Sequence, residues 1–570
     1  MPRRTSNPQL HIEGRYTTMK TFTIKALATS TAVLMATFAV PAIAQSQASD
    51  GAADGGGSSP ATTVASPNST YSTADLGNGF FKRFFGYYGL ENGKSEAPAD
   101  PNAPAGRREG WPTQPATTPP LPFTEWPYGG ATSIGANRPA SVDSPLMTAI
   151  APSGLGKALA DAHIQIYGWL DVGGNYSSNN KPGGNAPAAY DYEPRRIQLD
   201  QAVVYVERTP DTVQQDHIDW GFRISGIYGV DYRYTTSLGI FSNQLVKHNK
   251  DYGYDMPMVY GEIYFPKVAQ GLILRFGRFI SAPDIEAQLA PNNYMYSHSM
   301  TYTYDNYTNT GLIATLALTK NWIVQGAITD GSETALWNVG KRIANPFPNP
   351  LYPHSTFRKD PGAQASFTGC VRYQSNSGRD SFYVCMNALN NAKWGYNNLN
   401  WRGMTYYHRF TDKWHISMES YDLYQKDVPN ALNSEVQTIY SAGGTPFSPQ
   451  YLPFNAPNLA QCANVNELRC AAHARAFLNY INFTPSKMDN ISLRSEFFDD
   501  EEGQRTGTKT RYVSAAIGWQ HWFSPQIEIR PEVAYYRALD ANAFNGNSNL
   551  GIAPNKRNMV SLAGDVIIHF

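Results

Sequence analysis

From about residue 160 onward the chain alternates apolar and polar residues with a period of two, which strongly restricts its fold. In residues 164–173 (IQIYGWLDVG), Ile164, Ile166, Leu170 and Val172 fall on one side of an extended chain. A repeat of two is typical of a β-strand with one apolar face. The same pattern recurs at residues 219–225, 414–419 and 527–535. A soluble β-sandwich would alternate in the same way, so alternation alone leaves the kind of β-protein open.

The lengths of the links between the predicted strands indicate a barrel. Links after even-numbered strands are short, as at residues 266–271 and 485–487, whereas links after odd-numbered strands are mostly long. Short turns at one end and long loops at the other are typical of outer-membrane barrels, whose closure leaves no unpaired strand edge in lipid. We therefore expect an all-β fold, a transmembrane antiparallel up-and-down β-barrel of about 16 strands, over residues 161–570. The predicted strands are 161–176, 194–208, 216–231, 257–266, 270–280, 308–319, 321–330, 361–374, 380–391, 400–410, 413–424, 472–484, 488–500, 510–523, 526–537 and 558–570.

The composition agrees with this interpretation and argues against two other classes of protein. Charged residues make up 16% and aromatic residues 13% of the chain, whereas soluble domains carry about 25% charged residues. The mean hydropathy of −0.42 is too low for a helical membrane protein. Lys and Arg together equal Asp and Glu at 46 each, so no basic excess indicates a nucleic-acid partner.

The first 160 residues differ from the rest of the chain. Residues 1–44 are predicted to be a signal peptide with its true start at Met19 and an Ala42-Ile43-Ala44 cleavage site. Residues 45–160 are rich in Pro, Gly and Ser, and we expect a largely disordered periplasmic extension of low complexity. The aromatic stretch at 79–90 (GFFKRFFGYYGL) is compatible with a plug, a membrane-surface patch, a partner contact or a short helix on the barrel rim.

Three stretches of the barrel region resemble the OmpL-like β-barrel porin family (β-barrel porin-2) of Gram-negative bacteria. They are residues 166–180 (IYGWLDVGGNYSSNN), 190–211 (YDYEPRRIQLDQAVVYVERTPD) and 277–305 (GRFISAPDIEAQLAPNNYMYSHSMTYTYD). The resemblance covers about residues 161–570 and implies an outer-membrane barrel with pore activity. It implies no catalytic or ligand-binding residues.

The stretch 280–307 is the main candidate for a functional element. No Lys or Arg occurs from residue 279 to 319, while Asp284, Glu286 and Asp305 lie inside the stretch. It links the fifth and sixth predicted strands, and in sixteen-stranded porins generally the third external loop folds inward and narrows the pore. By that similarity we predict these three carboxylates at the constriction.

Strand parity predicts basic side chains facing this loop. Arg196, Arg223 and Arg275 are expected in the lumen, because a charge that faces lipid near the midplane costs about 2–4 kcal/mol. Two interpretations stay open: the wall charges pair with one another, or a basic wall faces the acidic loop and sets up a field across the pore. The loop tyrosines are candidates either for stacking on sugar rings or for a girdle at the membrane interface, and they are Tyr294, Tyr296, Tyr302 and Tyr304.

The four cysteines predict two disulfides in an oxidising compartment. Cys370 and Cys385 lie directly opposite each other about a turn near residues 377–378, and Cys462 and Cys470 could close the longest loop. Adding His473 to the second pair gives only three potential metal ligands, so we expect no metal there, and no cofactor.

These observations predict a porin of the cell outer membrane, a passive diffusion channel for small hydrophilic solutes or ions. A sugar-selective channel and a structural or adhesion barrel with a blocked lumen are the alternatives. We expect outer-membrane lipid and small solutes as partners, and a homo-oligomer, a trimer by analogy with other porins. The chain contains no G-x-S-x-G or HExxH motif, so we predict no enzyme activity.

Overall fold

A computed structural model describes most of residues 144–570 and short parts of the chain before them. The predicted signal peptide and most of the extension lie outside the described residues. The described ranges are 73–94, 107–112, 134–136, 144–188, 190–237, 239–246, 248, 250–280, 284–334, 364–391, 398–441, 459–547 and 550–570.

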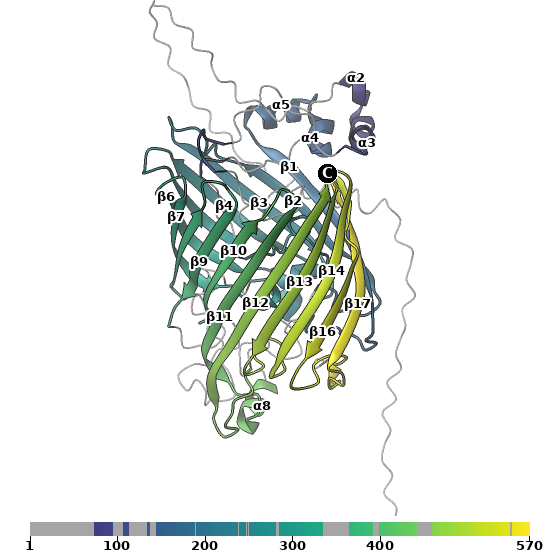
Figure 1. The fold of residues 1–570 in the computed structure, drawn as a ribbon, viewed down its shortest axis with the longest axis vertical. Helices are drawn as coiled ribbons and strands as arrows, with labels where there is room; N and C mark the ends of the chain where they lie inside the picture. Colours follow the sequence, from purple (N-terminus) through teal and green to yellow (C-terminus); the bar gives the residue numbers. More distant parts are fainter. Residues whose placement is uncertain are drawn as a thin grey trace, which may run out of the picture. The chain divides into compact units, whose positions relative to one another are not determined.

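The strands form one closed antiparallel sheet, the barrel that the sequence predicts (Figure 1). Each strand pairs with its neighbours in sequence, and β1 closes the ring by pairing with β17. Because β15 and β16 both pair with β14 and β17, they occupy one barrel position, and the ring has 16 positions. The strands are β1 (Gln165–Ser177), β2 (Ile197–Arg208), β3 (Asp219–Gly229), β4 (Gly253–Phe265), β5 (Leu272–Ile280), β6 (Thr308–Ala317), β7 (Trp322–Ser332), β8 (Ser366–Gln374), β9 (Asp380–Leu389), β10 (Asn400–Arg409), β11 (Trp414–Pro429), β12 (Arg469–Ser486), β13 (Asp489–Asp500), β14 (Thr510–Ser524), β15 (Ile527–Ile529), β16 (Glu532–Ala538) and β17 (Asn558–His569).

A proline explains the break between β15 and β16, where the sequence predicts one strand over residues 526–537. Pro531 has no backbone N–H, so the ladder hydrogen bond at this position cannot form. The backbone carbonyl of Pro531 still accepts a hydrogen bond from the Trp519 N–H at 3.0 Å. The two halves of the strand therefore keep the same neighbours.

A second irregularity corrects the predicted orientation of β2. Asp171 lies opposite Gln201, but the next residue, Val172, lies opposite Leu199, so one residue of β2 is bulged. A bulge reverses the side-chain alternation beyond it. Val203 and Tyr205 share the parity of Ile197, so an unbroken strand would point all three to lipid; because of the bulge, Val203 and Tyr205 are instead buried on the inner face.

The outer face has the layering of a membrane barrel. Apolar side chains such as Leu493, Ile517 and Val533 are exposed midway along adjacent strands. Near the short turns Trp414 stacks on Phe483 with ring centroids 4.5 Å apart, as in an aromatic girdle. Near the long loops, charges of alternating sign lie directly opposite one another on four adjacent strands, namely Asp422, Arg475, Asp499 and Arg511. The apolar band lies between these two boundaries.

The helices lie outside the barrel wall or in its loops. No helix among the described residues is long and apolar enough to cross a membrane. The helix α8 belongs to the β11–β12 loop, at the end of the barrel away from the C-terminus (Figure 1). The helical segments are α2 (Thr73–Leu76), α3 (Phe80–Glu91), α4 (Pro145–Ile150), α5 (Gly154–Asp161), η2 (Val230–Tyr234), α6 (Asn243–Val246), η3 (Ala290–Asn292), α7 (Met300–Thr303) and α8 (Ser434–Ser441).

Helices occur in two described parts of the extension, residues 73–94 and 144–160, whereas residues 107–112 and 134–136 are joined by an isolated β-bridge between Arg107 and Ala136. The aromatic stretch forms α3, whose Tyr88 hydroxyl donates to the His569 carbonyl at 2.6 Å. Just after α3, the Gly93 N–H donates to the Phe523 carbonyl at 2.8 Å. Both acceptors lie where strands end at the short turns, so α3 contacts that rim of the barrel. Within α3 the Phe84 ring contacts Phe80 and Tyr88, four residues away on either side, with centroids 5.9 and 5.6 Å apart, whereas Phe81 and Phe85 are exposed.

Candidate pore constriction

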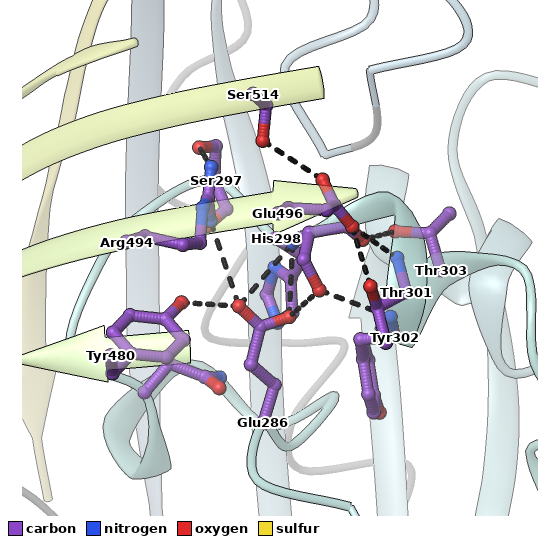
Figure 2. Close-up of polar contacts among 12 residues, drawn as sticks. Glu286, Ser297, His298, Thr301, Tyr302, Thr303, Tyr480, Arg494, Glu496 and Ser514 are labelled. Carbon is purple, nitrogen blue, oxygen red and sulfur yellow. Dashed lines mark hydrogen bonds and ion pairs between the residues drawn. The ribbon is translucent and has the colours of Figure 1, made fainter. Parts of the chain in front are cut away.

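The loop between β5 and β6 lies inside the barrel and reaches the opposite wall. The ends of the loop leave β5 and β6, whereas its middle contacts β13, which is eight positions from β5 in the ring of 16. The loop carries no Lys or Arg and has many hydroxyl and backbone donors. Its carboxylates and hydroxyls therefore pair with side chains that project inward from the wall (Figure 2).

Glu286 connects the loop to two strands of this wall. The Ser299 N–H and hydroxyl donate to Glu286 Oε2 at 2.9 and 2.7 Å, which ties the first part of the loop to the residue that caps α7. The Tyr480 hydroxyl of β12 donates to Glu286 Oε1. Arg494 of β13 lies 3.6 Å from the same oxygen (Figure 2). Burial raises the pKa of Glu286 above its ordinary value, and the Arg494 charge opposes that rise.

Two more wall carboxylates receive donors from the loop. The Thr301 N–H and hydroxyl donate to Glu496 Oε1 at 2.5 and 2.7 Å, at the start of α7. The Ser297 N–H donates to Glu532 Oε2 at 3.1 Å. Arg494 donates in turn to the Ser297 carbonyl at 2.6 Å. Arg494, Glu496 and Glu532 of the wall thus hold the segment of the loop from Ser297 to Thr301.

The first half of the loop is anchored at the β15–β16 break. Arg530, next to Pro531, donates to the backbone carbonyls of Ala290 and Asn293 at 2.5 and 3.1 Å. The Arg530 guanidinium also pairs with Asp565 of β17. On the neighbouring wall, Gln201 donates to the Gln288 carbonyl at 2.8 Å. The loop is therefore held from several sides of the lumen.

Asp284 and Asp305 come together with Glu419 of β11. One side-chain oxygen of each lies within 4.8 Å of the others, and all three residues are buried. Burial raises the pKa of Asp284 above its ordinary value, and a hydrogen bond with the Asp305 carboxyl opposes that rise. Burial, and then the Asp284 charge, raise the pKa of Asp305 well above its ordinary value. The third carboxylate could not be identified from the sequence, because Glu419 looks like any other inward-facing residue of a strand.

The three predicted wall arginines pair with carboxylates that lie outside the loop. Arg223 and Arg275 do face inward, but each pairs with a carboxylate directly opposite on the neighbouring strand, Glu207 at 2.7 Å and Glu262 at 3.0 Å. Arg196 precedes β2 and pairs with Asp251 at 3.3 Å, near the long-loop end. The interpretation in which wall charges pair with one another therefore describes Arg223 and Arg275, whereas the Arg196–Asp251 pair lies outside the strands. The arginines that reach the loop are Arg494, Arg505 and Arg530.

The loop tyrosines are buried in the lumen, so the girdle interpretation is wrong. Tyr294 forms a 2.8 Å hydrogen bond with His415 Nε2, and the Tyr304 hydroxyl donates to the Pro187 carbonyl at 2.7 Å. His298 donates from Nε2 to the Ala287 carbonyl at 2.8 Å, and burial lowers its pKa to about 3. The neighbouring Ser297 and Ser299 hydroxyls point to Glu532 and Glu286 instead. These residues therefore do not form a Ser–His pair.

The four cysteines lie in the two predicted pairs. Cys370 of β8 lies directly opposite Cys385 of β9, with 1.98 Å between the sulfurs. Cys462 and Cys470 are 2.00 Å apart at the sulfurs, beside the start of β12. The first pair joins two strands of the wall, and the second closes part of the longest loop.

A closed 16-position antiparallel barrel with its third long loop folded into the lumen has the architecture of a porin. The model of the family described as "Putative beta-barrel porin-2, OmpL-like" matches residues 163–570, and the chain belongs to this family. None of the curated proteins matches the chain.

The barrel is similar to several solved structures at low sequence identity. The anion-selective porin from Comamonas acidovorans is 9% identical with a TM-score of 0.42, over 71% of this chain and 99% of that one. The outer-membrane channel DcaP of Acinetobacter baumannii is 9% identical with a TM-score of 0.39, over 71% and 97%. OprB of Pseudomonas putida is 10% identical with a TM-score of 0.40, over 74% and 97%. These likenesses concern the fold alone.

Proposed function

We propose that the protein is an outer-membrane channel for passive diffusion of small hydrophilic solutes or ions. Membership of the porin family supports a channel in general. The observation that carries the proposal is the loop of residues 284–307, which crosses the lumen and meets Arg494 on the opposite wall. A charged loop at this depth narrows the path and exposes permeants to charge in a confined space.

The electrostatics of the loop favour discrimination by charge over a fixed binding site. Glu286 of the loop faces Arg494 on the far wall, so charge of both signs is present at one level of the barrel. The hydrogen bonds of Glu286 and Thr301 hold these groups in place without a ligand. A permeant therefore passes through the electrostatic field of groups that are already fixed in place, as in a diffusion channel.

Burial of the constriction favours a second candidate, a barrel closed at rest. Glu286 is 3% and Arg494 0% exposed, although a wide aqueous pore would leave such side chains in contact with water. Movement of the loop would open this barrel. If the loop does not move, the barrel would serve as a structural or adhesion protein.

Planar-bilayer recording of the purified full chain tests the proposal. Stepwise openings with ohmic current would support the diffusion channel, and openings that sugar blocks would support a sugar-selective one. A protein that inserts into bilayers yet never conducts would eliminate both and leave the closed barrel. Heat-modifiable migration on gels is the control, because it reports a folded barrel whether or not current flows.

A further inference from the structure

The cluster of Asp284, Asp305 and Glu419 contrasts with Glu286 and Asp565, each of which has an arginine partner. Glu286 has Arg494, and Asp565 has Arg530. No salt bridge involves the three clustered residues among the described part of the chain.

Several of their side-chain oxygens also lack a hydrogen-bond donor from the surrounding described residues. Glu419 accepts from the Ile285 N–H through Oε2 at 2.9 Å, but its Oε1 has no partner among the described residues. Asp284 Oδ2 and both side-chain oxygens of Asp305 have no donor from any other described residue, and the two carboxyl groups interact with each other. Each of the three residues is at most 3% exposed, so bulk water cannot supply the missing hydrogen-bond donors.

A fourth unsatisfied group lies beside the cluster on the wall. Thr405 of β10 is directly opposite Glu419 of β11 in the sheet, so their side chains are neighbours on the inner face. Its hydroxyl is buried and has no hydrogen-bond partner among the described residues. A buried polar group without a partner costs about 1–3 kcal/mol, and a buried unpaired charge costs more. Several such groups in one place indicate that something else binds there.

We propose that Asp284, Asp305 and Glu419 bind a divalent cation, Ca²⁺, that fastens the constriction loop to β11. Oxygen ligands suit a hard cation, and Ca²⁺ takes 6–8 of them at about 2.3–2.6 Å. Ligand oxygens that all lie within 4.8 Å of one another can share one such ion. Mg²⁺ requires shorter bonds of about 2.0–2.1 Å and near-ideal octahedral geometry, so it fits this spacing less well.

The proposed ion would join parts of the chain that are distant in sequence. Asp284 lies near the start of the loop, Asp305 near its end, and Glu419 on the wall. One ion would therefore fix the entry and the exit of the loop to the same point of the barrel. It would also supply positive charge where the loop has none.

Terbium luminescence of the full chain, refolded in detergent without lipopolysaccharide and freed of metal with EDTA, tests this proposal. Tb³⁺ substitutes for Ca²⁺, and nearby tyrosines sensitise its emission. We expect one saturable site per chain, displaced by Ca²⁺ and at least about tenfold less readily by Mg²⁺. Asp305→Asn and Glu419→Gln should each weaken binding about tenfold or more, whereas Asp216→Asn, an exposed carboxylate at a short turn, should leave it unchanged.

Three results would overturn the inference. They are the absence of a saturable site in the unmodified chain, equal displacement by both ions, and wild-type affinity in both cluster variants. The first result is obtained without any variant, so a variant that fails to fold does not block the test. The assay has no conductance step, so its outcome is independent of the proposed channel.

Discussion

At the residue scale, the constriction depends on pairs between a loop and a wall that are far apart in sequence. Glu286 and Arg494 are both buried and lie 3.6 Å apart. Since Arg494 also donates to the Ser297 carbonyl, it holds the loop and balances its charge at once. Changes at these residues should therefore affect both ion preference and stability.

Removing the loop carboxylates should shift ion preference away from cations. In Asp284→Asn/Glu286→Gln, Arg494 loses its loop counter-charge, and anions become more favourable in the lumen. A unit charge at about 4 Å contributes about 1 kcal/mol in water, so the cation-to-anion permeability ratio should fall about two- to fivefold. The reversal potential in a salt gradient, recorded with EDTA present, measures the ratio. An unchanged potential would show that the loop does not control permeation.

Removing Arg494 should destabilise the barrel more than removing an arginine from its outer surface. Arg494→Gln leaves buried carboxylates without their cation, which costs about 3–5 kcal/mol. Arg475→Gln is the matched control, because that side chain is 57% exposed in its ion pairs with Asp422 and Glu501. An exposed pair contributes only about 0–1 kcal/mol. Urea unfolding followed by tryptophan fluorescence compares the two, and equal shifts would contradict the structural role of Arg494.

At the element scale, the strands were predictable from sequence because each carries its own signal. Alternation and loop length predict β13 at residues 488–500, and the structure places it at Asp489–Asp500. The exceptions have local causes that alternation does not reveal, namely the bulge in β2 and Pro531. The site was less predictable. The register of β2 with β3 would have been enough to predict the pair of Arg223 with Glu207. The contact of Glu286 with Arg494 depends instead on the path of a loop whose sequence has no periodic pattern.

The alternation also predicts how a single strand tolerates charge. Ile517 lies midway along β14 and faces out between Leu493 and Val533. Ile517→Arg should destabilise the barrel by about 2–4 kcal/mol, because its charge would lie near the membrane midplane. Ile517→Ala, which removes the side chain without adding charge, should cost less. The unfolding free energy in lipid vesicles measures both effects. If Ile517→Arg left the unfolding free energy unchanged, this face of the strand would not contact lipid.

At the scale of the whole molecule, the barrel closes without the extension. The last strand, β17, pairs with β1 through a continuous register from Trp169–His569 to Ser177–Ser561. The described helices before β1 add a few hydrogen bonds at the short-turn rim, such as that of Tyr88 with the His569 carbonyl. A typical hydrogen bond contributes about 0.5–1.5 kcal/mol net, which is small beside the closure of a complete ladder.

Deletion of residues 45–160 should therefore leave a folded barrel that still shows heat-modifiable migration on gels. A longer deletion, of residues 45–177, also removes β1 and leaves β2 and β17 as open edges. Lipid offers no hydrogen-bond partner to such edges, so the longer deletion should not give the shifted band. If the shorter deletion also fails to shift, α3 and α4 belong to the folding unit, because their contacts at the rim would then be needed for strands β14, β17 and β1 to meet.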